Sequence, residues 1–217
     1  MTKLPDEIIE RLKKLATPTI ANAIDEIGQG GIMKGIHAVG AGFKCAGRAV
    51  TVRQVTGPLG SFKVEDFRVG HMIDAAGPGD IIVVANGGAE VSTFGGMAAY
   101  AAKHRGIEGL VVDGGVRDRE EIIEFGFDVF SVHVTPTPGK TRLKVEQINE
   151  TIVACGVTVN PGDAILADGS GVAVLPQDHA EHIITLAEGY ARDDEKALEE
   201  LANGLSFTEA LKKFAKI

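Results

Sequence analysis

The sequence predicts an α/β protein with flanking helices and a helical C-terminal tail, and three observations carry this prediction. Apolar runs of strand length recur through the middle of the chain, for example at residues 110–112 and 127–134. Turns rich in glycine and proline separate these runs from segments with helical spacing of apolar residues. Residues 177–216 show the helical spacing of apolar residues throughout. Strands and helices are therefore expected to alternate, as they do in α/β folds.

The spacing of apolar residues in the N-terminal part predicts two short helices followed by a strand. Apolar residues recur at helical spacing over residues 5–27, and Thr17-Pro18-Thr19 interrupts them with a typical helix start. Residues 47–55 alternate well enough for a strand with one polar face, and glycines 57 and 60 mark the loop after it.

Two Pro-Gly-Asp turns each lead into a strand, at residues 77–85 and 160–168. Pro-Gly presets the turn dihedrals, and the aspartate that follows can accept a hydrogen bond from nearby backbone. Asp80 and Asp163 are therefore interpreted as turn formers rather than ligands.

A glycine-opened, alanine-rich helix is predicted from Gly95 to Ala102, with its C-terminal end at residues 103–106. The backbone amides of Gly95, Gly96, Met97 and Ala98 would lie at its N-terminus, where they could hold an anion. The alternative is that the small residues only allow close packing against a sheet.

The segment after this helix predicts a site at the end of a strand. Residues 110–112 form an apolar run that stops at Asp113, two glycines follow, and Arg117-Asp118 opens a helix that continues through Ile123. Ligands bind at such strand-to-helix turns in open α/β sheets. A guanidinium suits a carboxylate and an aspartate suits a hard cation. A purely structural Arg-Asp ion pair is the alternative.

The C-terminal part predicts strands at 127–134 and within 151–175, followed by helices over about 177–217. Because that tail is highly charged, it is a candidate to pack on a neighbouring subunit rather than on its own core.

Composition excludes several classes of function. The net charge of −8 gives no attraction to nucleic acid, and no basic stripe with aromatic residues is present. The N-terminus has no signal-peptide pattern and no segment of membrane-spanning length, so a cytoplasmic protein is expected. Cys45 and Cys155 lack metal-ligand spacing and are expected to be reduced thiols.

The amides near Gly95, the Arg117 guanidinium and the Asp118 carboxylate together predict a site for a small acid bound beside a divalent metal. Mg²⁺ or Mn²⁺ suits a single carboxylate completed by water. No serine, cysteine or lysine stands in a context typical of a covalent nucleophile. A metal acting as a Lewis acid would instead stabilise an enolate.

Four segments resemble the 4-hydroxy-4-methyl-2-oxoglutarate aldolase family, which shares a fold with the regulator of ribonuclease activity A. They are Gly95-Gly-Met-Ala, residues 105–118, residues 126–130 and Asn160-Pro-Gly-Asp163. The resemblance implies one domain over residues 1–217, with a swivelling β/β/α-type fold and layered sheets. It also implies homotrimers or homohexamers with sites between subunits, and metal-dependent release of pyruvate from oxo acids.

By the same resemblance, backbone at Gly95, Gly96, Met97 and Ala98 would bind the pyruvyl part of the substrate. Arg117 would hold its oxygens and Asp118 would bind the metal. The aldolases carry an acid at the position of Gly96, and its absence favours oxaloacetate decarboxylation over retro-aldol cleavage, which needs a base. Gly96→Asp or Gly96→Glu would then raise aldol cleavage if the new side chain reached a metal-bound water.

A further acid comes from a neighbour's C-terminal helix in the aldolases, and Asp194 or Glu195 is the candidate here, with a solvated helix face as the alternative. The competing function is a non-catalytic regulator that binds a ribonuclease. Regulator-type members lack the aspartate after the arginine and the long C-terminal helix, and this chain has both. Methyl transfer to a quinone, another activity attributed to the family, is disfavoured because no glycine-rich nucleotide fingerprint is present.

Overall fold

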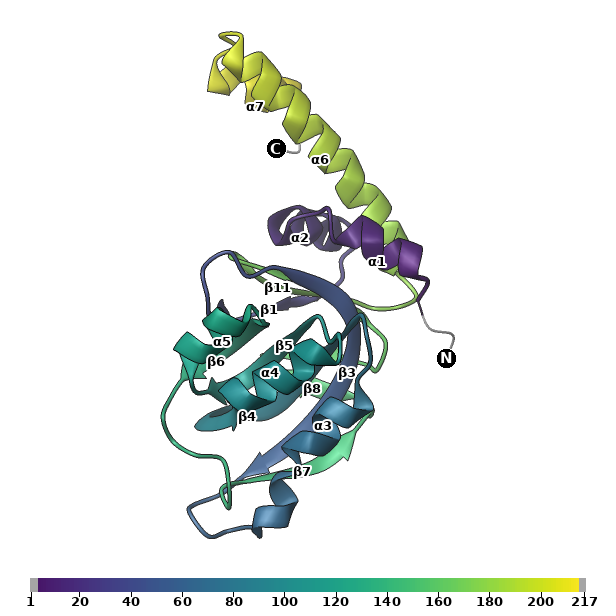
Figure 1. Cartoon of the computed structure of the whole chain (residues 1–217). Coiled ribbons are helices and arrows are strands. Elements are labelled where there is room, and N and C mark those ends of the chain that lie inside the picture. The colour runs from purple at the N-terminus through teal and green to yellow at the C-terminus, as the bar shows by residue number, and fades with distance from the viewer. Residues whose placement is uncertain (1–3, 215–217) are drawn as a thin grey trace.

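The computed structural model describes residues 4–214, whose strands form a nine-stranded mixed sheet and a separate two-stranded hairpin (Figure 1). The centre of the sheet is parallel, and it consists of β3 (Cys45–Thr56), β4 (Asp80–Phe94), β5 (Gly109–Val116) and β6 (Asp128–Val134). Antiparallel strands flank this centre. Beyond β3 lie β10 (Ala164–Asp168), β11 (Gly171–Leu175) and β1 (Ile32–Met33), in that order, and beyond β6 lies β2 (His37–Ala38). Strand β7 (Leu143–Ile148) pairs with the C-terminal half of β3. The hairpin of β8 (Ile152–Ala154) and β9 (Val157–Val159) packs on β4.

Three helices cover one face of the parallel strands: α3 (Val69–Ala75), α4 (Gly96–His104) and α5 (Arg119–Phe125) (Figure 1). A short 3-10 helix, η1 (Val64–Phe67), precedes α3. The fold is thus the α/β arrangement of layered sheets with flanking helices that was expected.

Side chains of β10 and β11 alternate between two hydrophobic cores. Ile165 and Ala167 belong to the core beneath the parallel strands and α3–α5, whereas Ala164 and Leu166 belong to a second core. Because successive strand residues point to opposite faces, one pair of strands forms the wall between both cores. The second core is completed by α1 (Asp6–Leu12), α2 (Thr17–Glu26) and the first half of α6 (Ala180–Ala202).

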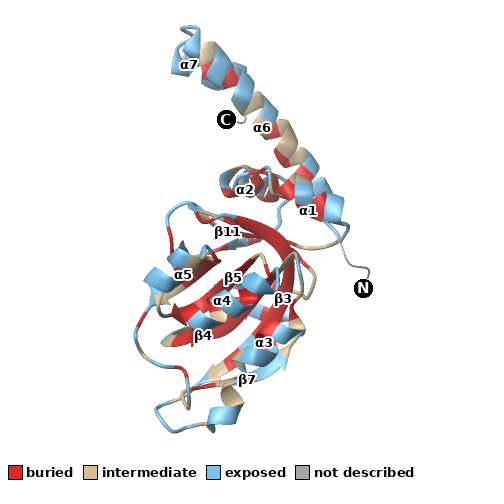
Figure 2. Ribbon diagram, in the orientation of Figure 1, coloured by how far each residue is buried: buried red, intermediate tan, exposed pale blue. Residues whose placement is uncertain are grey.

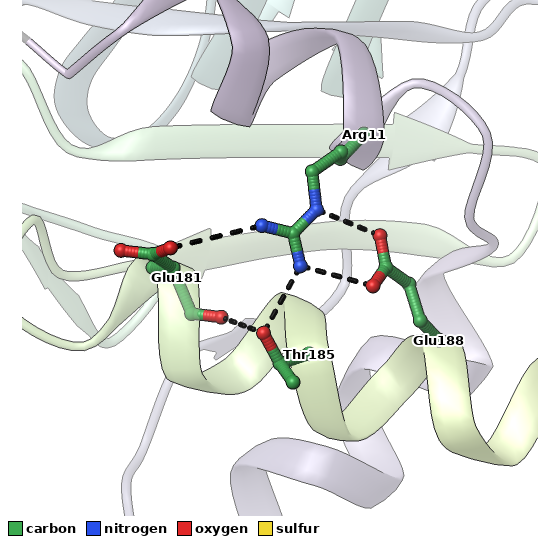
Figure 3. Close-up of polar contacts among 4 residues, drawn as sticks. All are labelled: Arg11, Glu181, Thr185 and Glu188. Atoms are coloured by element: carbon green, nitrogen blue, oxygen red, sulfur yellow. Dashed lines mark hydrogen bonds and ion pairs between the residues drawn. The ribbon is translucent and has the colours of Figure 1, made fainter.

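Polar contacts join α1 to α6. Arg11 donates from Nε and Nη2 to the two carboxylate oxygens of Glu188, at 2.8 and 2.9 Å, and from Nη2 to Thr185 Oγ1 at 3.0 Å (Figure 3). This two-pronged contact fixes the orientation of α6 relative to the N-terminal helices. The predicted helix start at Thr17 is confirmed, and its amide donates to Asp168 Oδ2 at 2.8 Å.

The second half of α6 extends away from the rest of the protein, and α7 (Phe207–Lys213) folds back along it (Figure 1). Buried residues become sparse there (Figure 2), and Leu198, Phe207 and Leu211 are exposed. The first half of α6 packs on its own chain, so the expectation that the tail would pack on a neighbouring subunit rather than on its own core is wrong for that half. Packing of the second half on a neighbour stays a prediction. No helix within residues 4–214 has the length and apolar content that crossing a bilayer requires.

Three expectations about strands were wrong. Strand β5 does not end at Asp113 but continues through both glycines to Val116, with Asp113 buried inside it. Strand β4 continues nine residues past position 85, through irregular pairing with β5. Strand β3 is confirmed, but the polar face expected over residues 47–55 is absent from residues 47–52, which are all buried, while Arg53 is exposed. The two turns are confirmed, since Asp80 accepts from the Gly77 amide and Asp163 from the Asn160 amide.

Candidate functional site

The candidate site lies where β4 and β5 end side by side. Phe94 pairs with Val116 at the last position of the parallel ladder, and the Arg117 amide donates to the Phe94 carbonyl at 3.0 Å. The chain leaves β4 into α4 at Gly95 and leaves β5 into α5 at Asp118. The two segments singled out in the sequence, 95–98 and 117–118, therefore meet at the carboxyl edge of the sheet, where open α/β sheets bind ligands.

A pocket of about 490 Å³ opens at this edge. Its floor is the end of β4, one wall is α4, and the other walls come from η1, α3 and the loop after β6. The lining residues are Phe67, Val69, Gly70, Ile73, Ser92, Thr93, Phe94, Gly95, Met97, Ala98, Ala101, Arg117, Asp118, Pro138, Gly139 and Lys140. Five of the six predicted site residues line it, and Gly96 is buried directly behind it.

Asp118 holds the two strand ends together. Its Oδ2 accepts the Gly96 amide at 3.0 Å and lies 3.2 Å from Nε of Arg117. Its backbone is left-handed, with φ of 57°, a conformation that aspartate and asparagine tolerate better than most residues. Within residues 4–214 neither terminal nitrogen of Arg117 forms a hydrogen bond, so that end of the guanidinium remains available for a carboxylate.

The amides at the start of α4 are not all available, which corrects the sequence interpretation. The Gly96 amide already donates to Asp118. The first helical hydrogen bond runs from the Ala99 amide to the Gly95 carbonyl, so the amides of Met97 and Ala98 come before it and can bind an anion. The Gly96 amide is therefore occupied within the chain, whereas ligand binding by the backbone of Gly95, Met97 and Ala98 stays a prediction.

A side chain at either of the two glycines would meet close contacts, so a neighbouring side chain would have to move. A Cβ at Gly95 would collide with Asp118 Oδ2 and lie 3.0 Å from Arg117 Nε. A Cβ at Gly96 would collide with Glu121 Oε2 and lie 2.8 Å from Glu121 Cβ. Glu121 was not predicted from the sequence, and its carboxylate occupies the space that a side chain at position 96 would need. The available signal was its spacing, because residues three apart on a helix share a face and Glu121 follows Asp118 by three.

We therefore expect Gly96→Asp to lower the melting temperature and not to increase any activity, because its side chain must displace Glu121. In a Glu121→Ala background the same change should cost less, since only the contact with Cβ remains. A double-mutant cycle measured by thermal unfolding should show coupling of about 1–2 kcal/mol. Strict additivity of the two changes would contradict the collision.

The donor set fits a divalent cation of the magnesium type. One oxygen of Asp118, Oδ1, forms no hydrogen bond with another described residue. The described residues contain no group of three or more His, Cys, Asp or Glu side chains arranged for a metal. An ion here would be held by the Asp118 carboxylate with water as the other ligands, which is a common arrangement for Mg²⁺.

Neither cysteine has the properties of a nucleophile. Burial raises the pKa of the Cys45 thiol well above its usual value. Burial, followed by the neighbouring Asp113 carboxylate, raises the pKa of Cys155 to about 12. Both thiols are free and stay protonated at neutral pH, consistent with the expectation of reduced cysteines.

A buried chain of hydrogen bonds supports the pocket floor. Thr93 Oγ1 donates to Gln54 Oε1 at 2.8 Å and accepts from Asn86 Nδ2 at 3.1 Å. All three side chains are buried. A Cβ at Gly114 would collide with the Asn86 amide, so the glycine within β5 is needed to keep this chain of contacts intact. Asn86 Oδ1 is buried and has no hydrogen-bond partner among the described residues, so this chain of contacts is not fully satisfied.

Asp194 and Glu195 lie in the second half of α6, which extends away from the sheet that carries the pocket (Figure 1). They are not among the residues that line the pocket of their own chain. Partial burial and then the adjacent Asp193 raise the pKa of Asp194.

The fold and the site define an α/β domain with a small-molecule pocket at the carboxyl ends of parallel strands. The chain belongs to the RraA-like family (Aldolase/RraA), whose model matches residues 17–174. This confirms the resemblance seen in the sequence.

Several relatives and solved structures are similar to this chain. Protein MJ0644 of Methanocaldococcus jannaschii is 36% identical over 129 residues, which are 59% of this chain and 62% of that protein. Protein DlpA of Legionella pneumophila is 27% identical over 94% of this chain but only 33% of its own length. The chain thus spans less than two thirds of either relative. A protein of Halalkalibacterium halodurans named as a putative 4-hydroxy-4-methyl-2-oxoglutarate aldolase is 29% identical over 90% of this chain and 89% of its own.

Among solved structures, an uncharacterized protein from Pseudomonas syringae pv. tomato has a TM-score of 0.87 at 26% identity, covering 97% of this chain and 99% of its own. Streptomyces coelicolor RraAS2, described as an unusual member of the RNase ES inhibitor RraA family, has a TM-score of 0.78 at 26% identity. It covers 94% of this chain and 100% of its own.

Proposed function

We propose that this protein is a divalent-metal-dependent lyase that acts on small oxo acids to release pyruvate. The observation that carries the proposal is the Arg117–Asp118 pair, which faces a pocket at a parallel-sheet edge beside the start of α4. The name of the Halalkalibacterium halodurans relative supports the same reaction class.

Each residue has a defined task in this proposal. Arg117 uses its unpaired terminal nitrogens to hold the carboxylate of the substrate, and the amides of Met97 and Ala98 contact its oxygens. Asp118 holds Mg²⁺ or Mn²⁺ through its unpaired oxygen, while its other oxygen keeps the two strand ends in register. The ion, when bound, supplies a Lewis acid for the negative charge that develops as a carbon–carbon bond breaks.

Glu121 affects which of two reactions the site favours, decarboxylation or retro-aldol cleavage. Oxaloacetate decarboxylation needs no base, whereas retro-aldol cleavage requires removal of a hydroxyl proton. The sequence lacks an acid at position 96, but Glu121 places a carboxylate beside that residue. We retain decarboxylation as the favoured reaction, because Glu121 is an exposed side chain that lies outside the residues lining the pocket.

The proposal also includes an oligomeric state, in which copies of this chain contact one another through the C-terminal helices. We propose a cytoplasmic homotrimer or homohexamer in which the extended half of α6 packs on a neighbour. The exposed apolar residues Leu198, Phe207 and Leu211 of α6 and α7 suit that contact. Asp194 or Glu195 would then be the acid that reaches the neighbouring pocket.

Purified protein stripped with a chelator should lose pyruvate release from oxaloacetate and regain it on addition of Mg²⁺ or Mn²⁺. Cleavage of 4-hydroxy-4-methyl-2-oxoglutarate should be about 10²- to 10⁴-fold slower, which is the usual value of general-base help. Coupled assays of pyruvate would measure both substrates. Full activity in the presence of chelator would refute the metal role, and fast aldol cleavage would show that Glu121 or a neighbour's acid serves as base.

The competing proposal is a non-catalytic regulator that binds a ribonuclease. It is supported by the similarity to Streptomyces coelicolor RraAS2, a member of a family of RNase ES inhibitors. The unpaired end of Arg117 in a formed pocket favours the enzyme. Absence of turnover on a panel of oxo acids with metal, together with inhibition of a purified RNase E-type enzyme, would reverse this preference.

A further inference from the structure

A second pocket, of about 300 Å³, lies beside β6 near the outer edge of the sheet. Its walls come from β2, from β6 and from the start of α5, and three basic side chains line it, those of His37, Arg119 and His133. It shares no residue with the pocket of the candidate site, and its lining contains no aspartate or glutamate. In a protein whose net charge is −8, this local set of basic groups favours an anionic ligand.

A backbone carbonyl fixes the direction of the Arg119 side chain. Nε of Arg119 donates to the Val39 carbonyl at 2.7 Å, and the Val39 amide donates in turn to the Val129 carbonyl of β6 at 2.9 Å. Neither terminal nitrogen of Arg119 has a partner within residues 4–214. The preceding carboxylate does not neutralise it, because Asp118 Oδ2 accepts the Gly96 amide and Asp118 lines the other pocket. A guanidinium held at Nε presents its remaining N–H groups as a fixed fork for an oxyanion.

A glycine turn within β4 holds the ring of His133. Gly87 and Gly88 both have left-handed backbone, with φ of 72° and 75°, at the point where the pairing of β4 with β5 shifts. The Gly88 carbonyl lies 3.2 Å from His133 Nε2. Because a carbonyl only accepts, Nε2 carries the hydrogen in this contact, and Nδ1 is the ring nitrogen that is left for a ligand.

His37 completes the set of basic groups from the neighbouring strand. It lies opposite Ser131 in the β2–β6 pair, and Ser131 precedes His133 by two residues, so the two histidines are diagonal neighbours across the strands. Its side chain is exposed, and neither ring nitrogen of His37 has a hydrogen-bond partner in the part of the chain that the structure describes. Two of the three basic groups are thus oriented by backbone carbonyls, and the third is free to turn toward a ligand.

We propose that this pocket is an anion site, in which Arg119 and the two histidines bind an oxyanion group of a small molecule. Phosphoryl and carboxylate groups share this chemistry, since both present several acceptor oxygens to guanidinium and imidazole N–H groups. The carbon part of the ligand contacts the apolar remainder of the lining, which consists of Ala38, Val39, Val132 and Val134. Because the site is separate from the pocket that contains Arg117, its occupancy does not depend on the proposed lyase activity.

NMR of the histidine Cε1–Hε1 signals would detect a ligand at this site, because the chain has only six histidines. Glycerol 3-phosphate, succinate and uncharged glycerol are each added at neutral pH, with the two signals assigned from His37→Gln and His133→Gln. We expect saturable shifts of the His37 and His133 signals with at least one of the two anions and none with glycerol. The anion with the lower Kd identifies the preferred group. Absent or unsaturable shifts with both anions would overturn the proposal.

Arg119→Met should raise the Kd of the anion that binds by about 10- to 100-fold, the usual value of hydrogen bonds to a charged group. Arg105→Met is the matched control, because Arg105 also donates from Nε to a backbone carbonyl, that of Ala76 at 2.9 Å, and lines neither pocket. It removes the same charge and should bind as wild type. His37→Gln, at an exposed position, should weaken binding without affecting the melting temperature. An unchanged Kd in Arg119→Met, or an equal loss in Arg105→Met, would show that the pocket is not the anion site.

Discussion

Asp118→Asn should reduce turnover by about 10³-fold or more while leaving the fold intact. Asparagine tolerates the left-handed backbone at this position, and its side-chain oxygen can still accept the Gly96 amide. It lacks the negative charge that holds a divalent cation, whose Lewis acidity is worth several kcal/mol in the transition state. Steady-state rates of pyruvate release at saturating Mg²⁺, with thermal unfolding alongside, would measure both effects.

Asp118→Ala provides the structural counterpart. It loses the charge and also the acceptor for the Gly96 amide, and alanine disfavours a φ of 57°. We expect the same loss of activity but a free energy of unfolding about 1–2 kcal/mol below that of Asp118→Asn. If Asp118→Asn retains activity within tenfold of wild type, the carboxylate is a structural cap and not a metal ligand.

Arg117→Lys should lower kcat/KM by about 10- to 100-fold although the charge is kept. Lysine presents a point charge and cannot make the two parallel hydrogen bonds that a guanidinium gives a carboxylate. The terminal nitrogens of Arg117 have no hydrogen-bond partner in the described structure, so their loss should have little effect on stability. The measurement is kcat/KM for oxaloacetate together with the melting temperature.

Arg119→Lys is the matched control. Arg119 lies two residues further along, donates from Nε to the Val39 carbonyl at 2.7 Å and does not line the main pocket. We expect wild-type kcat/KM from this variant, with at most a small loss of stability. Equal losses in both variants would mean that the turn, rather than a bound carboxylate, needs arginine.

Local patterns predicted the parts of the site that depend on neighbouring residues. The glycine start of α4, the Arg117–Asp118 helix opening and the two Pro-Gly-Asp turns were all recognisable, because caps and turns use short-range chemistry.

Features that depend on distant parts of the chain were missed. Strand β5 continues through Gly114 because β4 and β6 pair with it on both sides and the Asn86 side chain fills the space above that glycine. Burial of Asp113 is tolerated beside the Cys155 thiol, which comes from a hairpin some forty residues away. The collision of Glu121 with a side chain at position 96 and the placement of Lys140 likewise follow from the packing of separate elements. Sequence spacing alone carries no such information.

Ala164 and Leu166 face the terminal helices, while Ile165 and Ala167 face the core beneath the pocket. Side chains of α1 and α2 pack on one face of β10, whereas the core beneath the parallel strands packs on the other. Backbone movement in β10 is limited, because both neighbouring strands are bonded to it. A change in the N-terminal helices therefore alters the packing on one face of β10, while the opposite face keeps its contacts with the core beneath the parallel strands.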